Sequence, residues 1–244
     1  MGKTLNDKQR IAVNHGVGPM LVLAGPGSGK TTVILCRLRR ILEEITNKNK
    51  KILVVTFTKA AAAQMKERFG DRDSARVLFT TFHSLFFRIL RQAFGYSSEK
   101  ILGEDEKHTI LRNILAEKDW SVDDPEEFVS QFIRQASYMR NELLTPMEFI
   151  PVGTQREMFR QIYRAYDSYK ERHGKLDFDD MLLQCYELFL EEQSTLAFWQ
   201  NKFSFIMVDE FQDVNRVQYE CIRLLAAPQN NLFVVGDDDQ SIYG

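Results

Sequence analysis

The sequence lacks any apolar run near the ~20 residues that span a bilayer, and its N-terminus lacks the apolar core of a signal peptide. It has only three cysteines, far apart, which form neither a disulfide framework nor a metal site and indicate a reducing compartment such as the cytosol. A net charge of −2 excludes an overall basic character, so any nucleic-acid binding has to come from local patches. Internal repeats and low-complexity linkers are also absent.

What the sequence does contain is a set of short apolar runs typical of buried parallel strands. Each run is followed by small, polar or acidic residues and then usually by a helical pattern. This alternation predicts a doubly wound α/β fold with helices on both faces of a parallel sheet and with ligands at the carboxyl ends of the strands. The runs cover residues 20–23, 52–55, 77–79, 205–208 and 232–235.

The character of the chain changes between residues 92 and 174, where no strand-like run occurs and successive amphipathic helices are predicted. Asp124-Pro125 and Thr145-Pro146 have the pattern of helix starts, with proline at the first helical position. We therefore predict an all-helical domain over 92–174, inserted into an α/β domain made of 1–91 and 175–244.

A glycine-rich stretch follows the first predicted strand and opens a helix, the context that a phosphate-binding loop requires. Glycines allow consecutive backbone N–H groups to surround a phosphate, while Lys30 would reach the β- and γ-phosphates of ATP and Thr31 would ligate Mg²⁺. The strict pattern has glycine where this chain has Ala24, and a glycine turn without nucleotide is the alternative. The predicted binding residues are Ala24, Gly25, Pro26, Gly27, Ser28, Gly29, Lys30, Thr31 and Thr32.

Two adjacent acids end the strand predicted at residues 205–208. Asp209 is placed to hold Mg²⁺ through water, and Glu210 to orient and deprotonate the attacking water. On its own, such a pair is more simply a solvated strand end. Together with the lysine loop, it predicts a catalytic set of Lys30, Asp209 and Glu210 that hydrolyses ATP.

The last strand passes into the run VGDDDQSIYG, and the chain ends inside it. Gln240, near the carboxyl end of this strand, is placed to sense a phosphate, and Tyr243 offers a ring on which a base could stack. We therefore expect this run to join the nucleotide to nucleic acid, and the chain to be part of a longer protein.

These motifs, in this order, resemble the UvrD/Rep/PcrA group of superfamily 1 DNA helicases. The resemblance extends from Leu5 to Gly244 and implies that the α/β part is the first RecA-like motor domain, 1A, with the helical insert as domain 1B. The stretches that carry it are LNDKQRIAV, AGPGSGKTT, TFTKAAAAQM, TFHSLFFRIL, LDFDDML with VDEFQDVN, and VGDDDQSIYG.

The resemblance assigns further roles near the nucleotide. Gln9 is similar to the glutamine that reads the adenine edge, for which its carboxamide offers a donor and an acceptor; a polar residue on an N-terminal helix is the alternative. Gln240 resembles the glutamine that contacts the γ-phosphate and couples hydrolysis to movement. Gln212 is a weaker candidate for the same network.

DNA contacts are expected along the top of the same sheet, where hydroxyls and helix amides can hold phosphates and aromatic rings can stack on bases. Core packing is the alternative for the two phenylalanines, and His83 is better explained as a backbone or phosphate contact than as a base. Lys59-Ala60 departs from the common Asn-Lys of the family, which leaves a lysine–phosphate contact there in doubt. The predicted DNA-binding residues are Thr56, Phe57, Thr58, Thr81, Phe82, His83 and Tyr243.

Two charged patterns carry less weight. Arg156, Arg160 and Arg164 recur every four residues opposite an aromatic stripe; a solvated helix face explains them better than a DNA contact. The aspartates of LDFDDML are more simply an acidic helix start, favoured by the helix dipole, than a metal cluster.

The resemblance implies a bacterial, cytoplasmic motor that moves 3′→5′ on single-stranded DNA and unwinds duplex DNA at single-strand/double-strand junctions, in repair, replication or recombination. ATP in such motors lies between two RecA-like domains, so we expect this chain alone, without the second domain, to bind ATP weakly and not to unwind DNA. Two alternatives stay open: the motor part of a helicase–nuclease, which a distal nuclease domain would reveal, and a nucleotide-dependent DNA-binding module that never hydrolyses. The intact catalytic set argues against the module.

Overall fold

The computed structural model describes residues 5–45, 49–70, 73–118, 120, 122–227 and 229–237. The predictions for Gln240 and Tyr243 lie outside the described residues. The chain divides into two compact units, which we call the sheet unit (Met1–Leu85, Leu188–Val214 and Tyr219–Gly244) and the helical unit (Phe86–Glu187 and Asn215–Gln218). The predicted domain boundaries at residues 92 and 174 stay predictions.

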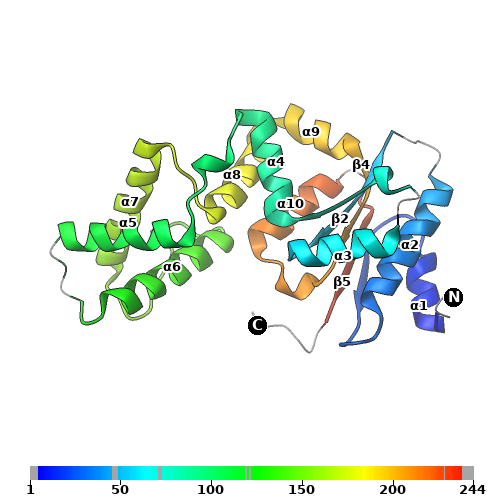
Figure 1. Cartoon of the computed structure of the whole chain (residues 1–244), viewed down its shortest axis with the longest axis horizontal. Coiled ribbons are helices and arrows are strands. Elements are labelled where there is room, and N and C mark those ends of the chain that lie inside the picture. The colour runs from blue at the N-terminus through cyan, green and yellow to red at the C-terminus, as the bar shows by residue number, and fades with distance from the viewer. Residues whose placement is uncertain are drawn as a thin grey trace. The chain divides into compact units, whose positions relative to one another are not determined.

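The sheet unit is built on five parallel strands, as the apolar runs predicted (Figure 1). Their order across the sheet is β1-β5-β4-β2-β3, so the last strand of the chain lies between the first and the fourth. The fold class is therefore α/β with a parallel sheet. The strands are β1 (Met20–Leu23), β2 (Lys51–Thr56), β3 (Val77–Thr81), β4 (Phe203–Val208) and β5 (Leu232–Gly236).

Helices bury the sheet. On one face, α1, α2 and α3 form a core with side chains that alternate along the strands, such as Val54, Met207 and Phe233. The intervening side chains, such as Leu53 and Val55, are fully buried as well, which explains why the central strands have continuous apolar sequences. The helices are α1 (Asp7–Asn14), α2 (Lys30–Glu44), α3 (Lys59–Phe69) and α9 (Gln193–Lys202), with short 3₁₀ turns at Ser74–Arg76 and Phe211–Asp213.

The strand register brings the predicted motifs to one edge of the sheet. Leu23 at the end of β1 pairs with Gly236 of β5, and Val208 at the end of β4 pairs with Val55 of β2. Beyond them, Thr56 of β2 pairs with Thr81 of β3. The nucleotide candidates therefore follow β1, β5 and β4, while the nucleic-acid candidates follow β2 and β3.

The helical unit has its own apolar core, in which the aromatic stripe of α7 (Phe159, Tyr163 and Tyr166) packs against α5 and α6. Asp124 caps the start of α6, with Pro125 as its first residue, as predicted. The segment before α5 and the segment after α7 lie side by side, joined by a parallel β-bridge between Ile101 and Leu176. Its helices are α5 (Glu104–Glu117), α6 (Pro125–Asn141) and α7 (Arg156–His173), with a 3₁₀ turn at Ser98–Lys100; α4 (Phe82–Phe94), α8 (Phe178–Glu191) and α10 (Arg216–Ala226) contribute residues to both units.

The prediction of a helix that starts at Thr145-Pro146 is wrong, because the structure has a single turn there. The Thr145 hydroxyl and amide both bond to Glu148, as at a helix start. Pro151 follows within six residues of Thr145 and prevents a continued helix. Within the described parts of the chain, no helix combines the length and apolar character that crossing a membrane requires.

Candidate functional site

The loop between β1 and α2 has the backbone that its glycines predicted. Gly27 and Gly29 adopt left-handed conformations, with φ of 69° and 91°, which glycine reaches without a Cβ clash. Gly29 is the N-cap of α2, and the first turn of this helix carries no acidic residue, so its free amides remain suited to a phosphate. Ala24 has no positive φ, and its amide donates to Gly236 O at 2.9 Å, which explains why alanine fits there.

Lys30 connects this loop to two carboxylates. Its Nζ lies 3.0 Å from Glu210 Oε2 and 3.5 Å from Asp237 Oδ2. Burial alone would lower the pKa of Lys30, but the hydrogen bond and charge of Glu210, together with the charge of Asp237, raise it. The ammonium is thus held protonated at the mouth of the loop, as a phosphate ligand requires.

Asp237 was not among the predicted site residues. It is buried and directly follows β5, which lies between the loop strand β1 and the acidic strand β4. The first acid after a buried strand was the available sequence signal, but only the strand order shows that this carboxylate faces Lys30.

Asp209 directly follows β4 and is a buried residue, 6% exposed. Burial and the neighbouring charge of Glu210 raise its pKa to about 6, against smaller opposing effects of the Glu210 amide and Lys30. Glu210 follows in a left-handed conformation with φ of 53°, uncommon for a residue with a side chain. Such strain clusters at functional sites, where surrounding structure maintains it.

Gln212 links the carboxylate of Glu210 to the end of β5. Its Nε2 donates to Glu210 Oε2 at 3.0 Å, and its Oε1 accepts from the Asp237 amide at 3.0 Å. The contact is close: a Cβ on Gly236 would lie only 3.2 Å from Gln212 Oε1. Gln212, predicted as a weaker candidate, therefore lies within the same cluster as Lys30 and Glu210.

The residues proposed for Mg²⁺ fit an ion that takes few protein ligands. Thr31 lies in the first turn of α2, and Asp209 is a buried carboxylate whose pKa is raised by burial and by the charge of Glu210. In the described part of the chain, no group of three His, Cys, Asp or Glu could hold a metal alone. Such a site suits Mg²⁺, which binds through one or two side chains together with substrate phosphates.

Gln9 lies against the loop. Its Nε2 donates to Ser28 O at 2.8 Å, while its Oε1 accepts from the Asn6 amide in a capping box at the start of α1. Its carboxamide is thus fixed in orientation beside the loop, and its reading of adenine stays a prediction.

The threonines predicted to contact DNA, at the carboxyl ends of β2 and β3, have hydrogen-bond partners within the chain. Thr58 caps α3, accepting from the Ala61 amide at 3.0 Å, and the Thr56 hydroxyl donates to Thr58 O at 3.0 Å. Thr81 similarly accepts from the Ser84 amide at 3.2 Å at the start of α4. These hydroxyls fix the two strand-to-helix turns at which phosphates are expected.

The two phenylalanines of this edge differ in exposure. Phe82 is 2% exposed and contacts Phe57 edge-on, with ring centroids 5.6 Å apart. This burial favours the core-packing alternative for Phe82 and leaves Phe57, which is partly exposed, as the ring that a base could reach. His83 is partly exposed, and its role stays a prediction.

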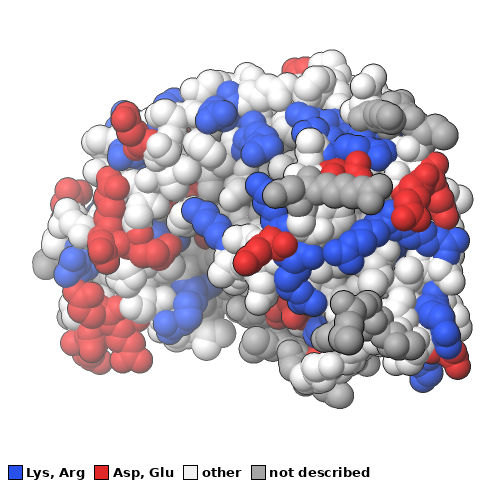
Figure 2. All heavy atoms as spheres, turned by 45° about the vertical axis from the view of Figure 1, so that its right-hand side comes forward, with Lys and Arg blue, Asp and Glu red and all other residues white. Residues whose placement is uncertain are grey.

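Basic side chains form several clusters on the face shown in Figure 2, separated by acidic and uncharged groups. The arginine stripe of α7 does not act as one patch: Arg156 and Arg164 are exposed, while Arg160 donates to Pro146 O and Met147 O at 3.0 Å each. A solvated helix face with one structural arginine describes this stripe.

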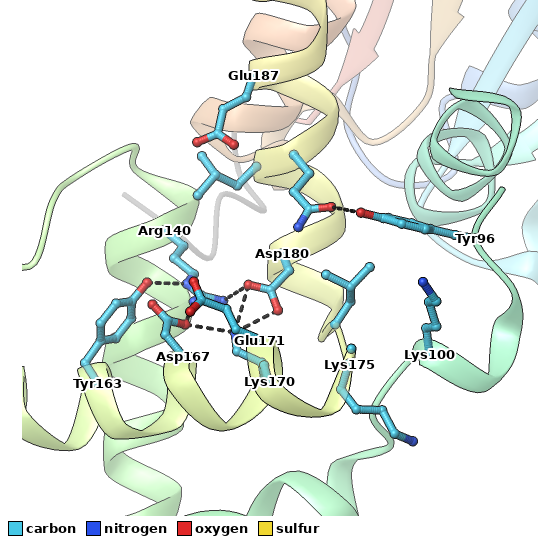
Figure 3. A pocket seen from close by; sticks show the side chains of 14 residues that line it. Tyr96, Lys100, Arg140, Tyr163, Asp167, Lys170, Glu171, Lys175, Asp180 and Glu187 are labelled. Atoms are coloured by element: carbon cyan, nitrogen blue, oxygen red, sulfur yellow. Dashed lines mark hydrogen bonds and ion pairs between the residues drawn. The ribbon is translucent and has the colours of Figure 1, made fainter. Parts of the chain in front are cut away.

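The aspartates of LDFDDML begin α8, as predicted. Asp177 and Asp180 each accept from the other's amide at 2.8 Å, which is a capping box. Both carboxylates also pair with buried Arg140 and Lys170. Arg140, Lys170 and Asp180 line one side of a pocket of about 330 Å³ within the helical unit (Figure 3). Because these charges compensate each other, we assign the pocket no ligand.

Comparisons with known proteins agree with these motifs. Residues 5–244 match the family model described as the UvrD/REP helicase N-terminal domain. YjcD of Bacillus subtilis is 40% identical over 98% of this chain and 32% of its own length. The ATP-dependent DNA helicase PcrA of Staphylococcus aureus is 38% identical over 98% of this chain and 34% of its own length. PcrA of Staphylococcus epidermidis is also 38% identical, over 99% of this chain and 34% of its own length. The chain thus spans about a third of the length of the curated relatives it matches.

Proposed function

This chain belongs to the family of UvrD/REP helicase N-terminal domains, and from this premise we propose that it is the ATP-binding part of an ATP-dependent DNA helicase. The observation that carries the proposal is the position of Lys30. At the mouth of a left-handed glycine loop, its ammonium lies within 3.5 Å of carboxylates from two other strand ends.

The residues around Lys30 suit hydrolysis of a nucleoside triphosphate. The loop amides and Lys30 would bind the phosphates, with Thr31 and Asp209 holding Mg²⁺, which neutralises charge on the phosphate oxygens. Glu210 would then release its ion pair with Lys30 and accept a proton from the attacking water. Gln212 supports this role because its amide fixes Glu210 Oε2.

We place single-stranded DNA across the carboxyl ends of β2 and β3. The support is that Thr56 and Thr81 are register partners and that each stands beside a helix start. Phe57 would stack on a base, with His83 beside a phosphate and Tyr243 as a further contact. Phe82 would support Phe57 from the core.

Beyond this site, we propose 3′→5′ movement on single-stranded DNA and unwinding at junctions, in the bacterial cytoplasm and in repair, replication or recombination. Gln240 would sense the γ-phosphate and couple it to movement. A second RecA-like domain of the complete protein would close over ATP, which agrees with relatives about three times as long as this chain. We expect the chain alone to hydrolyse ATP slowly at best.

The test is DNA-stimulated ATP hydrolysis by the complete protein, compared with its Glu210→Gln variant. The variant should bind ATP as the wild type does, because glutamine keeps the size and a hydrogen-bonding oxygen. It should lose turnover by a factor of roughly 10²–10⁴, the usual contribution of a general base. Unchanged hydrolysis in Glu210→Gln would refute the assignment of the base, and a wild type without hydrolysis would refute the proposed function.

A further inference from the structure

Helix α1, which carries Gln9, is short and weakly anchored by its own side chains. It has eight residues, of which only Ala12 and Val13 are buried, and its last turn has no basic residue to satisfy the terminal carbonyls. Isolated helices of this length are unstable in water, so the placement of α1 depends on contacts from elsewhere.

Arg37 of α2 provides that contact. It is 1% exposed, and its Nη1 donates to Ala12 O and Val13 O at 3.4 Å and also to His15 O. Its Nη2 donates to Gly16 O at 2.9 Å. The two terminal nitrogens of one guanidinium thus contact four carbonyls in the last turn of α1 and just beyond it, which the fork geometry of arginine makes possible.

The same guanidinium also packs against an aromatic ring. Its carbon lies 4.7 Å from the centre of the Phe233 ring of β5, a cation–π distance. Burial, followed by the nearby charge of Arg40, lowers the pKa of Arg37 to about 10, so the group stays charged at neutral pH. Arg37 therefore ties the end of α1 to the helix that begins at Lys30 and to the strand that ends beside Asp237.

We propose that Arg37 is a positioning residue for adenine recognition, holding α1 so that Gln9 stays against the phosphate-binding loop. Gln9 Nε2 lies 2.8 Å from Ser28 O at one end of α1, and Arg37 holds the other end. The inference rests on the proposed nucleotide site and on the role of Gln9 there. Arg37 acts through Gln9 and contacts no phosphate.

The chain contains a matched control on the same helix. Arg39 donates to Arg68 O at 3.2 Å and to Phe69 O at 3.4 Å in the last turn of α3, and it lies 5.7 Å from the Phe69 ring. It therefore performs the same task for a helix that carries no base-reading residue. Arg37→Lys and Arg39→Lys each keep the charge and lose the fork.

The test is equilibrium binding of ATP and of ribose 5′-triphosphate, which has the phosphates but no base. Arg37→Lys should weaken ATP binding roughly three- to tenfold, the usual effect of one lost hydrogen bond, and leave ribose triphosphate binding unchanged. Arg39→Lys should change neither. In a Gln9→Ala background, Arg37→Lys should cause no further loss.

Two results would overturn the proposal: equal weakening of both ligands by Arg37→Lys, or an undiminished effect in the Gln9→Ala background. Hydrogen exchange adds a readout independent of ligand, since Arg37→Lys should speed exchange in α1 and Arg39→Lys in α3. If Arg37→Lys does not fold, Arg37→Gln, which keeps a donor at this position, repeats the comparison. Unchanged binding of both ligands in Lys30→Ala would instead refute the nucleotide site itself.

Discussion

Replacing Arg140 by methionine should destabilise the helical unit more than any exposed charge change. Arg140 pairs with Asp177. It also pairs with Asp167 and Asp180, and its Nε donates to Tyr163 Oη at 2.6 Å (Figure 3). Burial would lower the pKa of Arg140, but the charges of Asp180 and Asp177 raise it well above its ordinary value.

The expected magnitude follows from what the substitution leaves behind. Asp177 is 2% exposed, and without Arg140 the ion pairs of Asp177 and Asp180 with Lys170 would remain, together with the weaker effect of Lys107 on Asp177. Removing one partner of a buried ion pair leaves an uncompensated charge, which costs about 3–5 kcal/mol in the free energy of unfolding.

The assay is hydrogen exchange in denaturant, which reports the opening free energy of α6 and α7 separately from the strands of the sheet unit. Arg112→Met is the control, because Arg112 pairs with Glu126 at 2.6 Å but the two side chains are 46% and 61% exposed. Such an exposed pair contributes about 0–1 kcal/mol. A loss below about 1 kcal/mol for Arg140→Met, or equal losses for both variants, would refute the reasoning.

Three further predictions test other parts of the structure. Because the pKa of Asp209 is raised to about 6 in the folded chain, its ionised form opposes folding, and the free energy of unfolding should fall as pH rises from about 4 through 6. In urea unfolding, Asp209→Asn should therefore be up to about 3 kcal/mol more stable than the wild type at pH 7.5 and no more stable at pH 3.5. Phe82→Ala should lower the free energy of unfolding by about 3–5 kcal/mol, because Phe82 is buried. Phe57→Ala should lower it less and should mainly weaken single-stranded DNA binding, by about 1–3 kcal/mol. Equal losses of stability in the two variants would contradict these different roles. Gly29→Ala should lower the free energy of unfolding by about 1–2 kcal/mol, because Gly29 has φ of 91° and the new Cβ would lie 3.0 Å from Gln9 Nε2. A variant that is as stable as the wild type in thermal melting would contradict this prediction.

Elements with local signals were predictable. The five apolar runs all became strands, and the glycines of the loop have the left-handed backbone that their sequence suggests. The start at Asp124-Pro125 was also correct. Thr145-Pro146 shows the limit of such signals, because a helix start forms there but the chain cannot continue it past Ile150-Pro151.

Contacts between distant segments were not predictable from spacing. Asp237 faces Lys30 only because β5 inserts between β1 and β4, and no local pattern specifies that order. Nothing in the sequence distinguishes Arg37 from Arg39 and Arg40 on α2, because only the fold brings the end of α1 beside it. Asp177 was correctly predicted as part of a helix start, but its pairing with Arg140 depends on packing between helices 37 residues apart in the chain.

The most direct test of the nucleotide site is calorimetric titration of this 244-residue chain with ATP and Mg²⁺, alongside the Lys30→Ala variant. The wild type should bind ATP weakly but measurably at high protein concentration. Lys30→Ala should abolish that binding in a chain that still folds, because the loop backbone stays intact. Its free energy of unfolding should be lower than that of the wild type, because the buried carboxylate of Asp237 loses Lys30 as an ion-pair partner. Equal ATP binding by a folded Lys30→Ala variant would contradict the account.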